Sequence, residues 1–463
     1  MTHKKVSLTN LDYDEQFITP AYGQRAMDSD IPKYELPAQS LPPRTAYDLI
    51  KDELMLDGNS RMNLATFVST WMEPEAVQLM SETFDKNMID KDEYPQTAEL
   101  EKRCVNILAR LWNSPAHEEA TGCSTIGSSE ACMLGGMAMK WKWRERMAAK
   151  GKATDKPNIV MGVNVQICWE KFARYWDVEA RLIPMEKDSY KITAEEVLKY
   201  VDENTIGVVA IMGTTFTGEY ENVKEINDAL EDLNTKTGWD IPIHVDGASG
   251  AFIAPFIQPE IEWDFRLKWV KSINTSGHKY GLVYPGVGWI IWRDSNELPD
   301  DLVFNVNYLG GQMPTFAINF SRPGSQIIAQ YYNFIRLGHE GYRSIQQNSS
   351  DIAQYLAKKI ADLGPFQLIS DGSDIPVFTF ALKKIENYSL FDFTAKLRER
   401  GWLIPAYSMP ENIEDLVIAR IVVKEGFSKD TANLLLEDIK RAVKHFESKK
   451  SMKPTLKGGS FHH

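Results

Sequence analysis

The sequence has few cysteines and lacks a long apolar segment. Only four cysteines occur among 463 residues, and none belongs to a C-x-x-C pair, so we expect neither a disulfide framework nor a metal site. No run of about 18 apolar residues is present, which argues against a membrane-spanning helix. Basic residues are outnumbered, because 52 Lys and Arg against 64 Asp and Glu give a net charge of −12. Nucleic-acid-binding proteins are normally basic, so nucleic acid is not an expected partner.

The N-terminal segment carries two lysines, Lys4 and Lys5, but no apolar stretch follows them. It is therefore not expected to be a secretory signal, and a reduced, cytoplasmic protein is predicted. Apolar residues make up 43% and charged residues 25% of the chain, which is typical of globular proteins. At roughly 100–200 residues per domain, the length suggests two or three domains.

Three segments of different character follow one another. Residues 1–60 are rich in proline and show one helical pattern, at 44–56, so we expect an N-terminal arm. Residues 61–345 alternate helical patterns with short apolar runs that lack strict alternation. Such runs are typical of strands buried on both faces of a mostly parallel sheet, which predicts an α/β domain. The expected strands are 158–161, 207–212, 241–245 and 288–292.

Residues 346–463 show a different pattern and predict a small α+β domain with a basic, glycine-containing tail from residue 449. Its expected elements are a helix at 352–363, a strand at 377–382, a helix at 390–400, a strand at 417–423 and a helix at 431–446.

Residues 125–131, Thr-Ile-Gly-Ser-Ser-Glu-Ala, precede a long helical pattern at 132–148. Hydroxyl side chains after a glycine at a helix start leave donors free for an anion, and the helix dipole favours negative charge there. The alternative is an ordinary serine N-cap. Taken alone, this signal does not separate the two.

Two further residues give the pattern its chemical meaning. Asp246 ends the apolar strand Ile243–Val245, where open α/β sheets bind ligands, although a hydrogen-bonded loop aspartate is the alternative. Lys279 follows Ser276, Gly277 and His278 in a segment with little helical character, and a lysine amine can form a Schiff base with a carbonyl cofactor. Pyridoxal phosphate needs a phosphate cradle, an acid for its ring nitrogen and a lysine for its aldehyde. The combination predicts this cofactor.

The chain resembles the pyridoxal-phosphate-dependent group II decarboxylases, and within them the bacterial glutamate decarboxylases. The resemblance runs from about residue 20 to the C-terminus. Its matching strings are residues 63–67, 87–95, 124–131, 165–169, 244–246, 276–279, 308–311 and 319–323. It implies the fold of type I pyridoxal-phosphate enzymes and decarboxylation of L-glutamate to 4-aminobutyrate and CO2, a proton-consuming reaction that suits acid resistance.

The resemblance also implies residue roles. Lys279 carries the cofactor, Asp246 pairs with its ring nitrogen and Gln166 stacks on its ring. The remaining cofactor contacts are Ser128, Ser129, Thr215, Ser276 and His278, together with Ser321 from a neighbouring subunit. The site therefore needs a homodimer at least, and bacterial relatives suggest a hexamer built of dimers. Gln166 stands where the aromatic amino-acid decarboxylases usually have histidine, which favours glutamate.

Substrate contacts are implied in the same way. Thr66, Phe67, Asn87 and Asp90 surround the distal carboxylate, and Arg420 grips the α-carboxylate with its planar guanidinium. The alternative for Arg420 is a surface charge at a strand end. Lys424 stands where some relatives have a second arginine.

Two residues are assigned to loops and tails. Tyr308 matches a loop tyrosine that reprotonates Cα, and packing on the lid is the alternative. His463 aligns with a terminal histidine that blocks the site at neutral pH, with His462 adjacent. A cloning remnant or a disordered tail is the alternative.

Two rival functions are weighed at this stage, and a third is rejected. One is another pyridoxal-phosphate enzyme, either an aminotransferase or an aromatic decarboxylase. Another is a sensor that keeps the fold, but residues 1–60 have too few basic residues for a DNA-binding module. Calmodulin is not an expected partner, because the segment after Ser448 has no tryptophan and no amphipathic repeat.

Overall fold

The computed structural model describes residues 33–306, 313–449 and 453–455. Two units divide the chain, residues 1–62 and residues 63–463. The first contains α1 (Pro43–Leu54) and the short 3₁₀ helix η5 (Ser60–Met62). Proline suits the start of α1, since its fixed φ is helical and the N–H it lacks would have no partner there. The helix expected at 44–56 is thus confirmed.

The second unit is built on a seven-stranded sheet of order β1-β7-β6-β5-β4-β2-β3. Strands β6, β5, β4, β2 and β3 pair in parallel, whereas β7 runs antiparallel to both β6 and β1. The expected mostly parallel α/β sheet is confirmed. Its strands are β1 (Thr121–Thr125), β2 (Asn158–Gly162), β3 (Glu179–Ile183), β4 (Thr205–Ile211), β5 (Ile243–Asp246), β6 (Val270–Thr275) and β7 (Gly288–Trp292).

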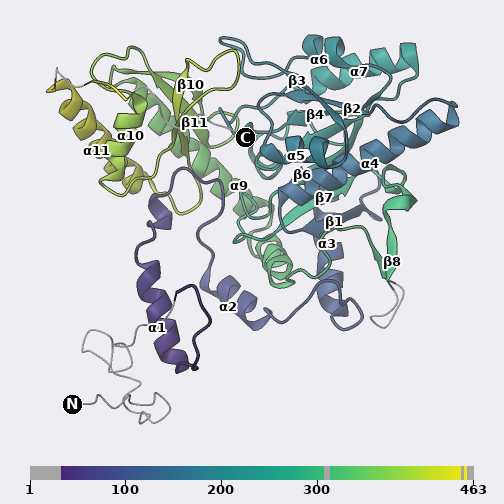
Figure 1. Cartoon of the computed structure of the whole chain (residues 1–463), viewed down its shortest axis with the longest axis horizontal. Helices are drawn as coiled ribbons and strands as arrows, with labels where there is room; N and C mark the ends of the chain where they lie inside the picture. The colour runs from purple at the N-terminus through teal and green to yellow at the C-terminus, as the bar shows by residue number, and fades with distance from the viewer. Residues whose placement is uncertain (1–32, 307–312, 450–452, 456–463) are drawn as a thin grey trace. The chain divides into compact units, whose positions relative to one another are not determined.

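Helices pack around the sheet (Figure 1). They are α2 (Pro74–Glu82), α3 (Pro95–Leu111), α4 (Ser128–Ala149), α5 (Ile167–Tyr175), α6 (Ala194–Tyr200), α7 (Val223–Thr237) and α8 (Ala254–Ile257), with the 3₁₀ helices η6 (Gly250–Phe252), η7 (Ser295–Glu297) and η8 (Asp300–Leu302). Helix α4 lies close on the sheet, because a Cβ at Gly135 would stand 2.5 Å from the ring of His244. Helix α7 ends at Gly238 in the left-handed conformation (φ 67°), as glycine permits.

Strands β2, β4 and β7 are buried along their whole length. This burial explains their unbroken apolar sequences, since both faces of the sheet are covered. The four expected strands correspond to β2, β4, β5 and β7. Three strands escaped prediction: β1, β3 and β6 are more polar, and β3 is largely exposed at the edge of the sheet.

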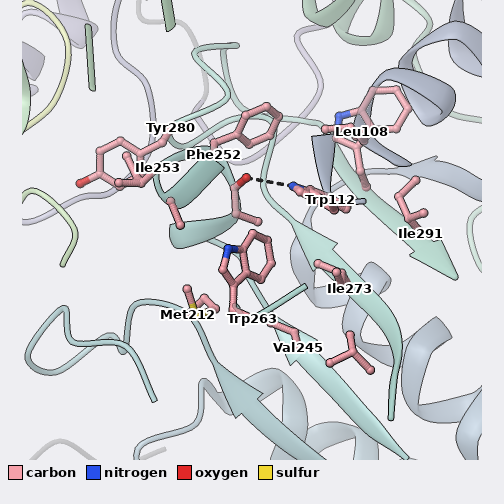
Figure 2. Close-up of a cluster of buried hydrophobic side chains, with 14 of the residues drawn as sticks. Leu108, Trp112, Met212, Val245, Phe252, Ile253, Trp263, Ile273, Tyr280 and Ile291 are labelled. Atoms are coloured by element: carbon pink, nitrogen blue, oxygen red, sulfur yellow. Dashed lines mark hydrogen bonds between the residues drawn. The ribbon is translucent and has the colours of Figure 1, made fainter. Parts of the chain in front are cut away.

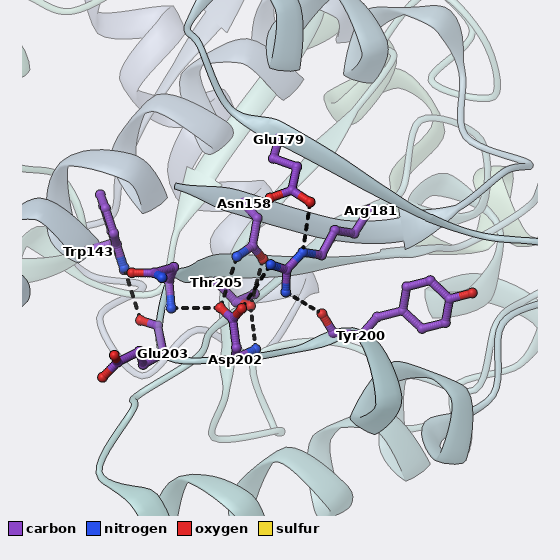
Figure 3. A network of polar contacts seen from close by, with 9 residues as sticks. Trp143, Asn158, Glu179, Arg181, Tyr200, Asp202, Glu203 and Thr205 are labelled. Carbon is purple, nitrogen blue, oxygen red and sulfur yellow. Dashed lines mark hydrogen bonds and ion pairs between the residues drawn. The ribbon is translucent and has the colours of Figure 1, made fainter. Parts of the chain in front are cut away.

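An apolar cluster and a polar network hold the elements of the large sheet together. In the apolar core, Trp112 Nε1 donates a hydrogen bond of 3.0 Å to the carbonyl of Ala251, and Trp263 packs edge-on against Trp112 (Figure 2). At the amino ends of β2 and β4, Asn158 Nδ2 donates to Asp202 Oδ1 at 2.9 Å while Thr205 Oγ1 donates to Asn158 Oδ1 at 2.7 Å (Figure 3). The amino ends of β2 and β4 are therefore tied together by protein contacts.

The C-terminal part forms a four-stranded antiparallel sheet of order β10-β11-β13-β12, so the expected α+β character is confirmed. Its elements are β10 (Phe366–Asp371), β11 (Val377–Leu382), α10 (Leu390–Arg398), β12 (Ala406–Ser408), β13 (Val417–Val422) and α11 (Lys429–Glu447). A separate pair joins β8 (Phe304–Val306) to β9 (Met313–Thr315).

The helix expected at 352–363 is the last part of the longer α9 (Ser325–Ala361), which bends at Gly338. Residue 345, the predicted end of the large domain, lies inside α9, and the domain boundaries stay a prediction. Within the described ranges, none of the helices combines the length and the apolar character needed to cross a membrane.

Candidate active site

A cavity of about 230 Å³ lies where the carboxyl ends of β4 and β5 meet the start of α4. This is the edge at which open α/β sheets bind ligands. Eight of the residues singled out in the sequence line it: Ser128, Ser129, Gln166, Thr215, Asp246, Ser276, His278 and Lys279. Residues separated by up to about 150 positions are thus brought to one place.

One end of the cavity is the N-terminus of α4. The N-cap is Gly127, which has no side chain to cap the helix, so the alternative of a serine N-cap is wrong. Ser128 and Ser129 instead open the first turn, and Ser128 Oγ lies 2.7 Å from Ser276 Oγ. A Cβ at Gly127 would stand 2.9 Å from the ring of His278. Free N–H groups and hydroxyls therefore converge as in an anion site.

His278 closes this end as a neutral ring. Its Nδ1 accepts hydrogen bonds from the N–H groups of Val287 (3.3 Å) and Gly286 (3.4 Å), so Nε2 carries the proton. Burial, and next the positive charge of Lys279, lower the pKa of His278 to about 4. The ring is thus a hydrogen-bond donor through most of the acid range.

Asp246 stands at the carboxyl end of β5 with both oxygens hydrogen-bonded. Oδ2 accepts from Trp169 Nε1 at 2.9 Å, and Oδ1 accepts from Asn274 Nδ2 at 3.1 Å and from the N–H of Ala248 at 3.2 Å. Only donors surround the carboxylate, so its plane is fixed. Cys132 Sγ also donates to Oδ2, at 3.7 Å. The alternative, a carboxylate engaged by its own loop alone, is wrong, because three of its four donors are side chains of α4, α5 and β6.

A row of hydrogen bonds continues behind Asp246. Asn274 turns its Oδ1 to His244 Nε2 (2.8 Å), and His244 Nδ1 meets Ser272 Oγ at 2.7 Å. Since Asn274 uses its amide N–H toward Asp246, Nε2 of His244 carries the proton and Nδ1 accepts from Ser272. Burial lowers the pKa of His244 to about 4. The row holds Asn274 in the orientation that serves Asp246.

Lys279 has an amine suited to nucleophilic attack. Burial, opposed by the charge of Asp246, lowers the pKa of its ammonium group, which raises the fraction of neutral amine. Its Nζ lies 5.2 Å from the ring centre of Phe67, and its carbonyl accepts a hydrogen bond from Ser69 Oγ at 2.8 Å. The segment from Thr66 to Ser69 therefore lies beside the lysine.

Arg420, on β13, belongs to the same neighbourhood. Its Cζ lies 4.8 Å from the ring centre of Phe67, and its guanidinium donates to the carbonyls of Thr215 (2.5 Å) and Ala65 (2.8 Å). The alternative of a surface charge is wrong, because Arg420 is only 8% exposed. Its Nε is buried and has no hydrogen-bond partner among the residues that the structure describes, so donor capacity remains for a ligand. Thr66, which follows Ala65 in the chain, is partly buried.

Asn87, Asp90 and Ser321 form a second group. Asn87 Nδ2 donates to Ser321 Oγ at 3.4 Å, and the N–H of Asp90 donates to the carbonyl of Asn87 at 3.1 Å. These three residues are not among the described residues that line the cavity. Tyr308 and His463 lie outside the described residues.

Sequence reasoning missed four residues of this site. Trp169 and Asn274 hold Asp246, and Cys132 and Cys168 line the cavity. The ligand atoms of the two cysteines and Asp246 lie within 4.8 Å of one another. Trp169 lies in residues 165–169, which match the family, but no role was assigned to it. Asn274 lies in β6, a strand that was not predicted, so nothing in the sequence singled it out.

The residues present fit pyridoxal phosphate. The helix N-terminus with three hydroxyls matches a phosphate, the fixed carboxylate of Asp246 matches a protonated ring nitrogen, and Lys279 matches an aldehyde. Glycine at 127, where a Cβ would meet His278, leaves the cradle open for close approach.

Comparison with known proteins supports the same cofactor. Residues 32–383 match the family model of the pyridoxal-dependent decarboxylase conserved domain. Glutamate decarboxylase of Aliivibrio fischeri is 59% identical over 435 residues, which cover 93% of this chain and 94% of that protein. Glutamate decarboxylase 5 of Arabidopsis thaliana is 50% identical over 444 residues, 96% of this chain and 90% of that protein.

Solved structures agree. Glutamate decarboxylase of Lactobacillus brevis superposes with a TM-score of 0.89 at 51% identity, covering 93% of this chain and 98% of its own. Sphingosine-1-phosphate lyase of Burkholderia pseudomallei has a TM-score of 0.76 at 20% identity, covering 92% of this chain and 96% of its own. The second likeness concerns the fold alone.

Proposed function

Because the chain belongs to the pyridoxal-dependent decarboxylase family, we propose that it decarboxylates L-glutamate to 4-aminobutyrate and CO2 with pyridoxal phosphate as cofactor. The observation that carries the proposal is 59% identity, over 93% of the chain, with a protein named glutamate decarboxylase. The cavity supports it independently, since it joins an anion cradle, a fixed carboxylate and a lysine.

The cavity residues divide the task of holding the cofactor. Ser128, Ser129, Ser276 and the N–H groups of the first turn of α4 bind its phosphate. Asp246 accepts a hydrogen bond from its ring nitrogen, and Lys279 holds it covalently. When bound, pyridoxal phosphate supplies an electron-poor ring that stabilises the charge left at Cα when CO2 departs.

Further side chains position the cofactor and move a proton. Gln166 stacks on the ring, while Thr215 and His278 bound the cavity on its other sides. Asn274 and Trp169 keep the carboxylate of Asp246 in place. Loss of CO2 leaves an electron pair at Cα that one proton must neutralise, and Tyr308 is the residue proposed to deliver it.

The substrate is held by its two carboxylates. Arg420 binds the α-carboxylate, and its two hydrogen bonds to backbone carbonyls fix the guanidinium beforehand. Phe67, in contact with both Arg420 and Lys279, keeps this part of the site apolar. Thr66, Asn87 and Asp90 bind the distal carboxylate.

The proposal also covers the oligomeric state, the domains and the cellular role of the protein. Ser321 serves the cavity of a neighbouring subunit, so the protein is a homodimer at least and a hexamer built of dimers by likeness to bacterial relatives. Residues 1–60 act as an arm, 61–345 as the cofactor domain and 346–463 as the small domain. The enzyme works in the cytoplasm in acid resistance, and His463 closes the site near neutral pH.

The decisive experiment incubates the purified protein and pyridoxal phosphate with L-glutamate and measures 4-aminobutyrate and CO2. L-aspartate, L-glutamine, L-tyrosine and L-tryptophan complete the panel, and Lys279→Ala is the control. We expect equal amounts of both products from glutamate alone. Release of 2-oxoglutarate would indicate an aminotransferase, and turnover of the aromatic amino acids without turnover of glutamate would overturn the substrate.

A further inference from the structure

A second cavity, of about 280 Å³, lies at the opposite edge of the sheet from the first. It is bounded by the C-terminal half of α4, the residues that precede β5, the start of β6 and the end of β7. Helix α4 therefore borders two cavities, with Ser128 at one and Arg146 at the other. None of the roles assigned above involves this second cavity.

Its lining contains hydrogen-bond donors that lack partners. Arg146 Nη2, Trp269 Nε1 and Trp292 Nε1 are buried side-chain nitrogens without a hydrogen-bond acceptor among the described residues, and all three residues line this cavity. A buried donor left unpaired costs about 1–3 kcal/mol. Three such donors around one cavity indicate an occupant that offers several acceptor atoms.

The charges around the cavity favour an anion. Lys142 and Lys271 have carboxylate partners, Glu145 at 3.6 Å and Glu297 at 3.1 Å. Within the part of the chain that the structure describes, Arg146 has no carboxylate within 4.0 Å. Burial lowers the pKa of Arg146, while Asp240, Glu297 and Glu145 raise it from beyond ion-pair distance. A buried charge is expensive unless it is paired, so Arg146 needs a counter-ion.

The charges of the lining narrow the class of ligand. Lys142 and Lys271 are each paired with a glutamate, so among the described residues Arg146 is the basic side chain of the lining without an ion pair. Because Asp240 and Glu297 also line the cavity, this arrangement suits a small ion of low charge and disfavours a polyanion. Indole N–H groups and a guanidinium are donors only, and a carboxylate or phosphate oxygen accepts from both.

We propose that this second cavity is a binding site for a small oxyanion of carboxylate or phosphate type, held by Arg146, Trp269 and Trp292. Water alone would satisfy the indole groups, but it would leave the guanidinium without a counter-ion. An oxyanion satisfies both requirements at once.

The experiment uses the holoenzyme, because bound cofactor already occupies the phosphate cradle of the first cavity. The melting temperature is followed against inorganic phosphate and, in a second series, against acetate, in a buffer free of other oxyanions. A ligand that binds the folded state alone raises the melting temperature in proportion to its occupancy. We expect a saturable rise with at least one of the two ions, and the ion that gives the lower Kd identifies the chemistry.

Variants then locate the site. Arg146→Met should raise the Kd at least tenfold, and Trp269→Phe should raise it severalfold while keeping an aromatic ring. Arg144→Met, an exposed arginine of the same helix, is the matched control and should leave the Kd unchanged. Equal Kd values in the parent, Arg146→Met and Trp269→Phe would place phosphate or acetate elsewhere and overturn the proposal.

Crystals of the parent holoenzyme soaked in selenate give an answer that does not depend on the stability of any variant. We expect an anomalous peak within hydrogen-bond distance of Arg146 Nη2. Water alone in this cavity, with selenate bound at other places or nowhere, would overturn the proposal.

Discussion

The indole Nε1 of Trp169 donates a hydrogen bond of 2.9 Å to Oδ2 of Asp246. The tryptophan is fully buried and lies in the first turn of α5, whereas the aspartate ends β5. The bond therefore ties the orientation of the carboxylate to a helix packed against the sheet. A carboxylate that must meet a ring nitrogen from one direction is positioned by this contact as much as by its own strand.

Replacement of Trp169 by phenylalanine should weaken cofactor binding. A hydrogen bond to a charged group contributes about 1.5–3 kcal/mol, so we expect the Kd for pyridoxal phosphate to rise roughly 10- to 100-fold. The Kd is measured by reconstituting the apoprotein and following visible absorption. Trp143→Phe is the matched control, since Trp143 is also buried and donates from Nε1 to the carbonyl of Glu203 at 3.1 Å. A similar loss of affinity in both variants would contradict the role of Trp169.

Asp246→Asn should lower kcat while the cofactor stays bound. A neighbouring carboxylate shifts the pKa of a basic group by about 1–3 units, so the loss of its charge should reduce the rate more than tenfold. The asparagine oxygen can still accept from part of the set of four donors that surrounds the position. Cofactor retention after gel filtration is measured beside the rate. Parent-level turnover in this variant would remove Asp246 from the mechanism.

Lys279→Ala should abolish decarboxylation and leave the fold intact, because a partly buried ammonium group does not stabilise its surroundings. After borohydride reduction and denaturation, mass spectrometry should find the cofactor attached to the parent but not to the variant. Lys268→Ala, at an exposed lysine, should retain the attachment. Covalent cofactor in Lys279→Ala would show that another residue carries it.

The sequence was sufficient for the cofactor side of the site because its residues lie in short strings at the ends of elements. Ser128 begins a helix and Asp246 ends a strand whose patterns were visible, and the carboxyl ends of parallel strands share one edge. Lys279 follows β6, which was not predicted, and was found from its short string at residues 276–279. The same topology brought them into one cavity. Prediction succeeded here because local pattern and global topology point to the same place.

The supporting contacts could not be predicted in this way. Trp169 reaches Asp246 across 77 positions and Asn274 reaches it across 28, and neither residue type signals a partner by itself. The second cavity is harder still, since Arg146 resembles any charged residue on a helix. An N–H group without a partner is a property of packing, so it is visible only in three dimensions.

Glu221 carries the last prediction. It is 2% exposed, with Oε1 accepting from Asn164 Nδ2 at 2.9 Å and Oε2 accepting from the N–H of Ile211 at 2.8 Å. Burial raises its pKa to about 7 despite these donors. Between pH 7 and its ordinary pKa of 4.5, the folded state binds a proton that the unfolded state does not. The contribution of Glu221 to stability is therefore complete below pH 4.5 and lost as the pH rises through 7.

Buried histidines act in the opposite sense. The pKa of His244 is lowered to about 4, so the unfolded state binds the extra proton as the pH falls from 6.5, and stability falls with it. The titration of Glu221 opposes this loss over the same range. We infer that these two opposed titrations keep the stability of the parent protein more nearly level between pH 7 and 4.5 than either would alone.

Glu221→Gln should remove the stability that the protein gains from protonation of Glu221 as the pH falls. Glutamine does not titrate, so the stability deficit of the variant relative to the parent should be larger at pH 4.5 than at pH 8, by roughly 3 kcal/mol for a shift of about 2.5 pKa units. The loss of one acceptor adds a constant deficit at every pH and cancels in the difference. Unfolding is measured at pH 8, 6.5 and 4.5, with the exposed Glu225→Gln as the control. A deficit that does not grow toward acid pH would mean that Glu221 is ionised in the folded protein throughout.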